Sequence, residues 1–125
     1  MTTHKRYRAF GRVLESEVTL GELHEIPVDD RAPEWRLVLA DGLPPEAPDT
    51  TLIGTEDIAY GATVTLSLLR PREFRLVYSD TGTFDLSAPR GEIRWWRSPT
   101  CDDDLAAMDI LGRVLATMLH AEGAV

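Results

Sequence analysis

The side chains in this sequence that could do chemistry begin with three consecutive carboxylates, Asp102, Asp103 and Asp104. Consecutive side chains on a helix point about 100° apart, so three of them do not converge on one ion. Hard-cation sites draw their oxygen ligands from a shaped loop instead. Carboxylates in a first helical turn favour the positive end of the helix dipole. The run therefore predicts the start of a helix rather than a metal site.

The histidines and the single cysteine form no reactive constellation in the sequence. His4, His24 and His120 are far apart and lack the H-x-x-E or H-E-x-x-H spacing of metal ligands on one helix. Cys101 lies near a predicted helix N-terminus, which lowers the pKa of a thiol, but the three aspartates that follow oppose a thiolate. We therefore expect no metal site and no reactive thiol.

Signatures of nucleotide and hydrolase sites are missing from the sequence. There is no G-x-x-x-x-G-K-[ST] phosphate loop, no G-x-G-x-x-G and no G-x-S-x-G. The backbone cradle of a phosphate loop and its lysine cannot be dispersed over other residues. We therefore expect no catalytic residues, no bound cofactor and no catalytic activity from this chain alone.

The best candidate for a functional surface is a group of arginines and tryptophans near the end of the predicted sheet. Strand alternation places Arg94 and Trp96 on the sheet face opposite Trp95. Arginine and tryptophan are enriched in interface hot spots, which favours a partner-binding surface. Packing of Trp96 beneath the proline-rich segment 43–51 stays open as the alternative. The predicted partner-binding residues are Arg90, Arg94, Trp96 and Arg97.

Charge and cysteine content limit the partners and the compartment. Thirteen basic and twenty-one acidic residues give the 125-residue chain a formal net charge of -8. This field repels phosphate backbones and anionic lipid, so neither nucleic acid nor a membrane is an expected partner. A single cysteine excludes an internal disulfide and fits a reducing compartment, and the basic N-terminus lacks the apolar stretch of a signal peptide. These features predict a cytoplasmic protein with one domain, residues 1–125.

The elements that would position these residues have their clearest patterns in the second half of the chain. Four runs with strand-like alternation are separated by short turns that contain glycine or proline. They cover 63–69, 73–79, 83–87 and 92–97. Period-two alternation with one buried face predicts an antiparallel meander across 63–97.

After Pro99 the period of the apolar residues changes to that of a helix. Thr100 is a suitable N-cap, Asp103 can complete a capping box, and Gly123 is a suitable stop. The predicted helix covers about 101–121. Its apolar stripe, which should lie on the sheet, consists of Leu105, Met108, Leu111, Leu115, Met118 and Leu119.

The first half of the chain has weaker patterns. Residues 7–14 predict one strand, with Gly11 as a bulge or close approach, and 34–40 predict a second strand. Residues 15–27 are expected to form a loop with room for one turn, and the prolines of 43–51 predict a surface loop. Together the elements predict an α+β domain. It would have an antiparallel sheet of about five or six strands with the C-terminal helix packed on one face.

Several short motifs occur in an order that matches a known family. Residues 7–11 fit a Y-x-x-x-G opening strand, and 17–23 fit an S-x-x-P-L-x-E-L-like segment with Thr19 where proline is usual. Residues 74–86 fit an F-x-L-x-Y…G-x-F-x-V-like hairpin, and 111–123 fit a helix that ends in L-H-x-x-G. This order resembles the front, non-catalytic region of bacterial HPr kinase-like proteins, which are related to HPr serine kinase/phosphorylase.

The resemblance implies a function but supplies no catalytic residue. In that family the helix leads to an ATP-binding phosphate loop, which would lie beyond Val125. Related kinases occur in peptide-modification gene clusters, so the resemblance implies an accessory or recognition domain that binds a kinase core or a peptide or protein substrate. Two alternatives stay open: an N-terminal fragment of an ATP-dependent protein or peptide serine kinase, and a small-molecule-binding domain with a pocket between helix and sheet. Exposed apolar residues at the helix end would also allow a homodimer.

Overall fold

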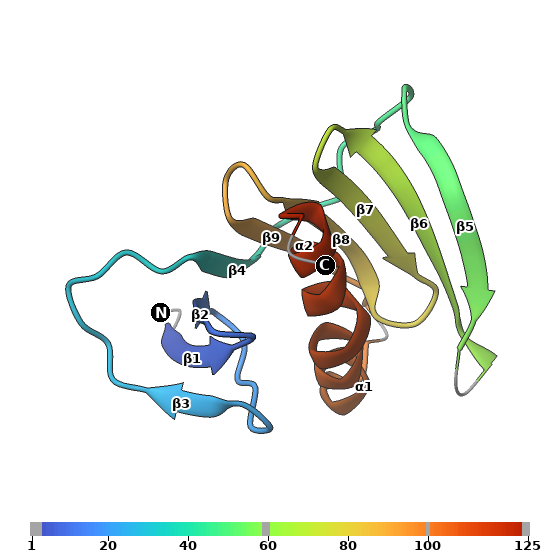
Figure 1. Ribbon diagram of the computed structural model, residues 1–125. Helices are drawn as coiled ribbons and strands as arrows, with labels where there is room; N and C mark the ends of the chain where they lie inside the picture. The colour runs from blue at the N-terminus through green and yellow to red at the C-terminus, as the bar shows by residue number, and fades with distance from the viewer. Residues whose placement is uncertain (1–3, 59–60, 100, 124–125) are drawn as a thin grey trace.

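One nine-stranded sheet runs through the computed structural model of this chain (Figure 1). The structure describes residues 4–58, 61–99 and 101–123. The strands are β1 (Lys5–Ala9), β2 (Arg12–Ser16), β3 (His24–Ile26), β4 (Trp35–Leu39), β5 (Thr51–Asp57), β6 (Thr63–Arg70), β7 (Glu73–Tyr78), β8 (Gly82–Ser87) and β9 (Glu92–Arg97). Their order across the sheet is β3-β1-β2-β4-β9-β8-β7-β6-β5.

The predicted sheet of five or six antiparallel strands is wrong, because the sheet is larger and mixed. Strand β4 pairs in parallel with β2 on one side and with β9 on the other, where Leu37 lies opposite Ile93. Every other neighbouring pair is antiparallel. Alternation along a strand shows which face is buried but not which distant strand lies beside it. The parallel pairing of β4 with β2 and with β9, which joins the first and second halves of the chain, therefore could not be predicted from local sequence patterns.

The meander strands β6 to β9 lie where alternation predicted them, and β4 occupies the predicted second strand. The strand predicted over 7–14 is instead a hairpin of β1 and β2. Phe10 and Gly11 have φ angles of 52° and 75°, and two consecutive positive φ values are typical of a two-residue type I′ turn. Strand β3 also replaces part of the loop expected over 15–27, and β5 forms where the sequence has no clear period.

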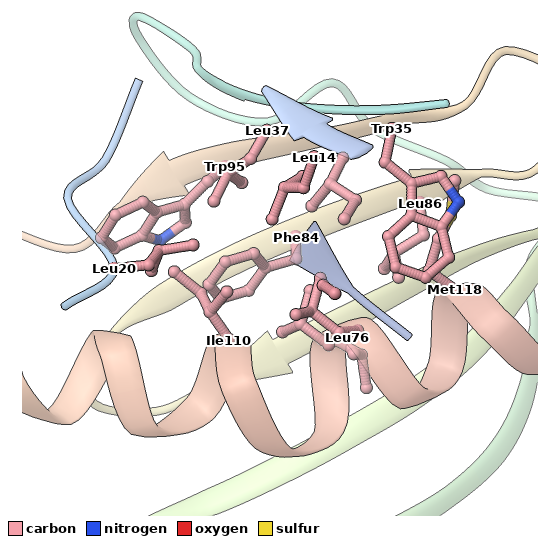
Figure 2. Packing of buried hydrophobic residues seen from close by; sticks show 14 of the residues in the cluster. Leu14, Leu20, Trp35, Leu37, Leu76, Phe84, Leu86, Trp95, Ile110 and Met118 are labelled. Atoms are coloured by element: carbon pink, nitrogen blue, oxygen red, sulfur yellow. The ribbon is translucent and has the colours of Figure 1, made fainter. Parts of the chain in front are cut away.

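A single C-terminal helix of nineteen residues packs on one face of the sheet (Figure 1). It consists of α1 (Asp103–Asp109), the π-helical segment η2 (Ile110–Val114) and α2 (Leu115–Ala121). Figure 2 shows Phe84 and Trp95 of the sheet pointing toward Ile110 of the helix. The rings of Phe84 and Trp95 are stacked, with centroids 5.3 Å apart and planes 5° from parallel. Within the described ranges, no helix is long and apolar enough to cross a membrane.

The buried side of the helix differs from the predicted stripe. Met108 is 58% exposed, whereas Ile110 and Val114, which were not assigned to the stripe, are fully buried. Residues Ile110–Val114 form the π-helical segment, in which i→i+5 hydrogen bonding widens the turn and moves side chains away from a regular 3.6-residue period. A stripe drawn from that regular period was therefore wrong at Met108.

The helix begins with a different cap from the predicted one. The carboxylate of Asp102 accepts hydrogen bonds from the backbone N–H groups of Asp104 and Leu105, at 2.8 and 3.2 Å. The predicted cap, Thr100, lies outside the described residues. The acidic run therefore starts the helix as expected, with its first member as the N-cap.

Candidate functional site

The structure divides the predicted partner-binding residues between different surfaces. Arg94 and Trp96 follow the alternation of β9 onto the face away from the helix. Arg97 lies on the helix side, where its guanidinium carbon is 5.6 Å from the ring centroid of Trp95. Arg90 is exposed in the turn between β8 and β9. The four residues therefore do not form one continuous patch.

Trp96 is buried rather than presented to a partner. Its side chain is 7% exposed and lies outside the main hydrophobic cluster. It lines a pocket of about 200 Å³ together with Pro45 of the β4–β5 connection. The prediction that Trp96 is exposed, on which the partner-binding surface depended, is therefore wrong. Partner binding through the arginines alone stays a prediction.

The β4–β5 connection passes over the polar face of the sheet. Residues 45–50 line a pocket of about 430 Å³ together with Arg75 and Asp85. Three ion pairs lie on this face, Arg75–Asp85, Arg94–Glu92 and Arg70–Glu73, with N···O distances of 2.6, 2.9 and 3.2 Å. The Arg75 pair is bidentate, since a second N–H···O contact measures 2.8 Å. These charges therefore compensate one another within the protein.

A groove between the C-terminal helix and strand β5 has different properties. Its volume is about 250 Å³. Its lining comes from β5, from the apolar side chains of β6 and β7, and from one helix residue: Ile53, Gly54, Thr55, Glu56, Val64, Leu66, Leu76 and Arg113. The position of Gly54 has nothing within 4 Å of where a Cβ would lie. The groove is therefore open above an apolar floor.

Strand β5 is the outermost strand on this side of the sheet (Figure 1). All seven of its residues are exposed, including Leu52 and Ile53 at 64% and 53%. The register shifts between Leu52 and Gly54, and from Gly54 to Asp57 the pairing with β6 is regular. An outer strand presents a row of N–H and C=O groups with which another extended chain can pair. Strand β5 therefore has the edge that strand addition requires.

A second pocket, which we call the Tyr78 pocket, shares Arg113 with the groove. Its volume is about 180 Å³. Its lining combines apolar, acidic and phenolic side chains: Ile58, Tyr78, Asp80, Leu105, Met108, Asp109 and Arg113. Arg113 Nη2 lies 2.8 Å from Glu56 Oε2 on β5. The ion pair Arg113–Glu56 therefore links the Tyr78 pocket to the groove.

Two polar atoms of the Tyr78 pocket are buried without a hydrogen-bond partner. Among the described residues, the hydroxyl oxygen of Tyr78 and Oδ1 of Asp80 are the buried side-chain atoms in this condition. Tyr78 itself is only 3% exposed. An unpaired buried polar group costs about 1–3 kcal/mol, and most native structures contain few of them. These two atoms distinguish the Tyr78 pocket from the polar sheet face.

Burial controls the protonation of this pocket. It raises the pKa of Tyr78, and the negative charge of Asp109 raises it further, although the nearby positive charge of Arg113 opposes the rise; the hydroxyl keeps its proton at neutral pH. Burial also raises the pKa of Asp109, although the hydrogen bond that its carboxylate accepts from Thr81 Oγ1 at 2.8 Å opposes the rise. The pocket therefore combines a protonated phenol with two carboxylates.

The other candidate residues are not brought together. Burial raises the pKa of the Cys101 thiol, while Arg97 opposes this rise and Asp103 adds to it. His4 lies 3.5 Å from Glu15 at the other end of the sheet. In the part of the chain that the structure describes, no three His, Cys, Asp or Glu side chains are grouped as metal ligands.

The sequence prediction missed the groove and the Tyr78 pocket. One available signal was the pair Asp109 and Arg113, two charged residues four positions apart that interrupt the apolar helix. A second was Tyr78, which alternation already places on the buried face at the end of β7. What could not be predicted is that the end of β7 lies beside this part of the helix.

Comparison with known proteins found no match: no family model, no curated protein and no solved structure is similar to this chain. The resemblance to HPr kinase-like proteins therefore stays a prediction from the residues. The function must be argued from the geometry of the chain itself.

Proposed function

We propose that this chain is a non-catalytic recognition domain that binds an extended protein or peptide segment as an added strand on β5. The observation that carries the proposal is the seven-residue edge strand, every residue of which is exposed, beside a groove with an apolar floor. In strand addition, main-chain hydrogen bonds supply affinity and alternate side chains enter pockets that supply specificity. Both parts are available at β5.

The direction of the β5 side chains supports this mode of binding. Gly54 lies opposite Leu66 and Glu56 lies opposite Val64, so both belong to the side of β5 that faces the helix. The missing side chain at Gly54 leaves room above Leu66. A residue of the bound segment would fill this space and bury apolar surface there.

The size of the two cavities between the helix and the sheet favours a segment over a small molecule at that place. The groove and the Tyr78 pocket have volumes of about 250 and 180 Å³. Pockets for small molecules usually measure about 300–1,000 Å³. Two small adjoining pockets along an exposed strand are better suited to successive side chains of one extended segment.

The resemblance to HPr kinase-like proteins would make this segment part of a kinase core or of a peptide substrate. The single cysteine is consistent with action in a cytoplasmic compartment. Neither point is needed for strand addition, which depends on β5 and the groove alone.

A random-sequence peptide display library tests the proposal. Selected peptides should shift the amide NMR signals of Thr51–Asp57 and slow their hydrogen exchange. Gly54→Leu should fill the groove and weaken binding by about tenfold. The matched control is Gly21→Leu, because nothing lies within 4 Å of a Cβ at that position either.

Three results would contradict strand addition at β5. The first is a library that yields no binder, and the second is a set of binders that shift only signals near Arg94 and Arg97. The third is self-association through β5, detected by sedimentation as a dimer that Gly54→Leu converts to monomer. Each would show that the exposed edge does not serve to bind a peptide.

A further inference from the structure

The Tyr78 pocket lies next to the proposed strand-addition groove and has chemistry that the groove lacks. We propose that it binds a cationic group, the ammonium or guanidinium of a basic side chain in the segment held on β5. The identity of the carrier rests on the proposed function, whereas binding of a cation by the pocket can be tested without it.

The charges around the pocket leave an excess of negative charge. Asp80 and Asp109 line the pocket. The cationic lining residue, Arg113, is compensated by Glu56 at 2.8 Å. Three carboxylates and one guanidinium therefore leave two negative charges in excess, and a cation would be attracted to them.

The hydrogen-bonding groups of the pocket fit a donor ligand. The hydroxyl oxygen of Tyr78 and Oδ1 of Asp80 are both acceptors without a partner. An ammonium offers three N–H donors and a guanidinium five, with no acceptor on either group. A basic side chain has the donors that these two acceptors lack, and its charge would strengthen each hydrogen bond.

The apolar lining suits the stem of such a side chain. Ile58, Leu105 and Met108 contribute to the walls. Lysine and arginine bury their methylene stems against apolar surface while the charged head reaches polar groups. Met108 is 58% exposed, and its unbranched thioether can adapt to the stem. The pocket therefore offers apolar walls for the stem of a basic residue and polar atoms for its charged head.

The geometry of the helix provides an independent observation. The π-helical segment Ile110–Val114 begins directly after Asp109 and contains Arg113. Segments of this kind inside α-helices are rare and frequently lie at functional sites. Here the segment carries Arg113, which lines both the Tyr78 pocket and the groove.

The two pockets together predict a pattern for the bound segment. Side chains on one face of an extended chain are two residues apart. Arg113 lines both pockets, so neighbouring side chains on the inner face of the segment would enter them. We expect a basic residue in the Tyr78 pocket and an apolar residue two positions away over Leu66.

The first experiment uses n-butylammonium chloride as the probe, because it needs no strand addition. Titration should produce saturable shifts in the amide NMR signals of Tyr78, Asp80 and Asp109. Sodium chloride and n-butanol at equal concentrations should produce no such saturable shifts. Asp80→Asn should weaken binding of the probe by about fivefold or more.

Two further variants keep this experiment decisive. Tyr78→Phe should also weaken binding of the probe, and if it fails to fold, Asp80→Asn decides alone. Asp30→Asn is the matched control, since it removes an exposed carboxylate from the connection that follows β3, at the opposite edge of the sheet. The proposal is overturned if the probe gives no saturable shift or binds Asp80→Asn as tightly as the unmodified protein.

The second experiment connects the pocket to the proposed function. In a library-selected peptide bound at β5, replacement of its basic residue by norleucine should weaken binding about tenfold. The same replacement should have little effect on binding to Asp80→Asn. If the peptide still adds to β5 but the replacement has no effect, the cation site is overturned and strand addition stands. If n-butylammonium binds while no peptide adds to β5, the cation site stands and strand addition is overturned.

Discussion

The two faces of the sheet differ in how their polar groups are satisfied. On the face away from the helix, Arg75 and Asp85 bind each other through two contacts, at 2.6 and 2.8 Å. On the helix side, the hydroxyl of Tyr78 and Oδ1 of Asp80 are buried without partners. The first face contains the residue types that are enriched at interfaces, and the second contains the unmet hydrogen bonds. Unsatisfied groups are the better indicator of a binding site here, because only they gain from a ligand.

The largest expected effect tests whether Trp96 stabilises the polar face. Trp96→Ala should lower the free energy of unfolding by about 3 kcal/mol, because it removes a large buried ring. Chemical denaturation measures this loss. Arg94→Ala provides the comparison, since an exposed ion pair contributes about 1 kcal/mol or less. If Trp96→Ala left the denaturation midpoint unchanged but abolished peptide binding, the binding site would lie on this polar face rather than at β5.

The next effect tests whether the ion pair of Arg75 is structural. Arg75→Ala should destabilise the protein by about 2 kcal/mol, because it removes two hydrogen bonds to a charged group that is only partly exposed. Urea denaturation measures the change, and amide NMR with a selected peptide should show unchanged binding at β5. A loss of peptide affinity without a loss of stability would contradict the comparison.

In the Tyr78 pocket, removal of a polar group is expected to leave the free energy of unfolding unchanged or to raise it, in contrast to the two preceding substitutions. Tyr78→Phe removes a buried hydroxyl that has no partner. Without ligand, the variant should therefore be as stable as the unmodified protein or more stable by up to about 1 kcal/mol. Thermal and urea denaturation of the two proteins measure the difference. A loss of several kcal/mol would mean that the hydroxyl makes a stabilising contact in solution, and the contrast between the two faces would fail.

The smallest effect concerns Asp109, which is partly exposed and therefore screened by solvent. Because burial raises its pKa in the folded state, the folded protein binds this proton more tightly than the unfolded chain does. Its contribution to stability is greatest below the unfolded pKa and is lost as pH rises through the folded pKa. Asp109→Asn should therefore be slightly more stable than the unmodified protein at neutral pH, with no gain near about pH 3. Urea denaturation at both pH values measures the difference, and a gain only in acid would contradict it.

Parts of the fold could be predicted because they depend on local periods. The alternation of Phe74, Leu76 and Tyr78 defines β7 without knowledge of its neighbours. The helix follows from its acidic start and its apolar repeat. The hairpin at Phe10 and Gly11 was missed because both residues adopt positive φ, a conformation that Phe10 alone does not suggest.

The candidate site depends on contacts that no local pattern contains. Tyr78 and Asp80 end one hairpin strand, whereas Asp109 and Arg113 lie on the helix, and the two segments meet only in the folded protein. The same holds for Trp96, which strand alternation alone left open to solvent or to cover by a loop. In the folded protein Trp96 is buried, and Pro45 of the β4–β5 connection lines the same pocket.

The sequence by itself determined the meander, the C-terminal helix, the acidic charge and the lack of nucleotide-binding motifs. These properties depend on the residue types and on periods of two and 3.6 residues, which operate over a few neighbours. The tertiary structure alone decided that β4 joins the two halves of the chain by parallel pairing and that β5 is left as an open edge. It also decided that Trp96 is buried and that the hydroxyl of Tyr78 lacks a hydrogen-bond partner. Strand order and burial arise from pairing between distant segments, and alternation specifies a face but never the neighbour that packs against it.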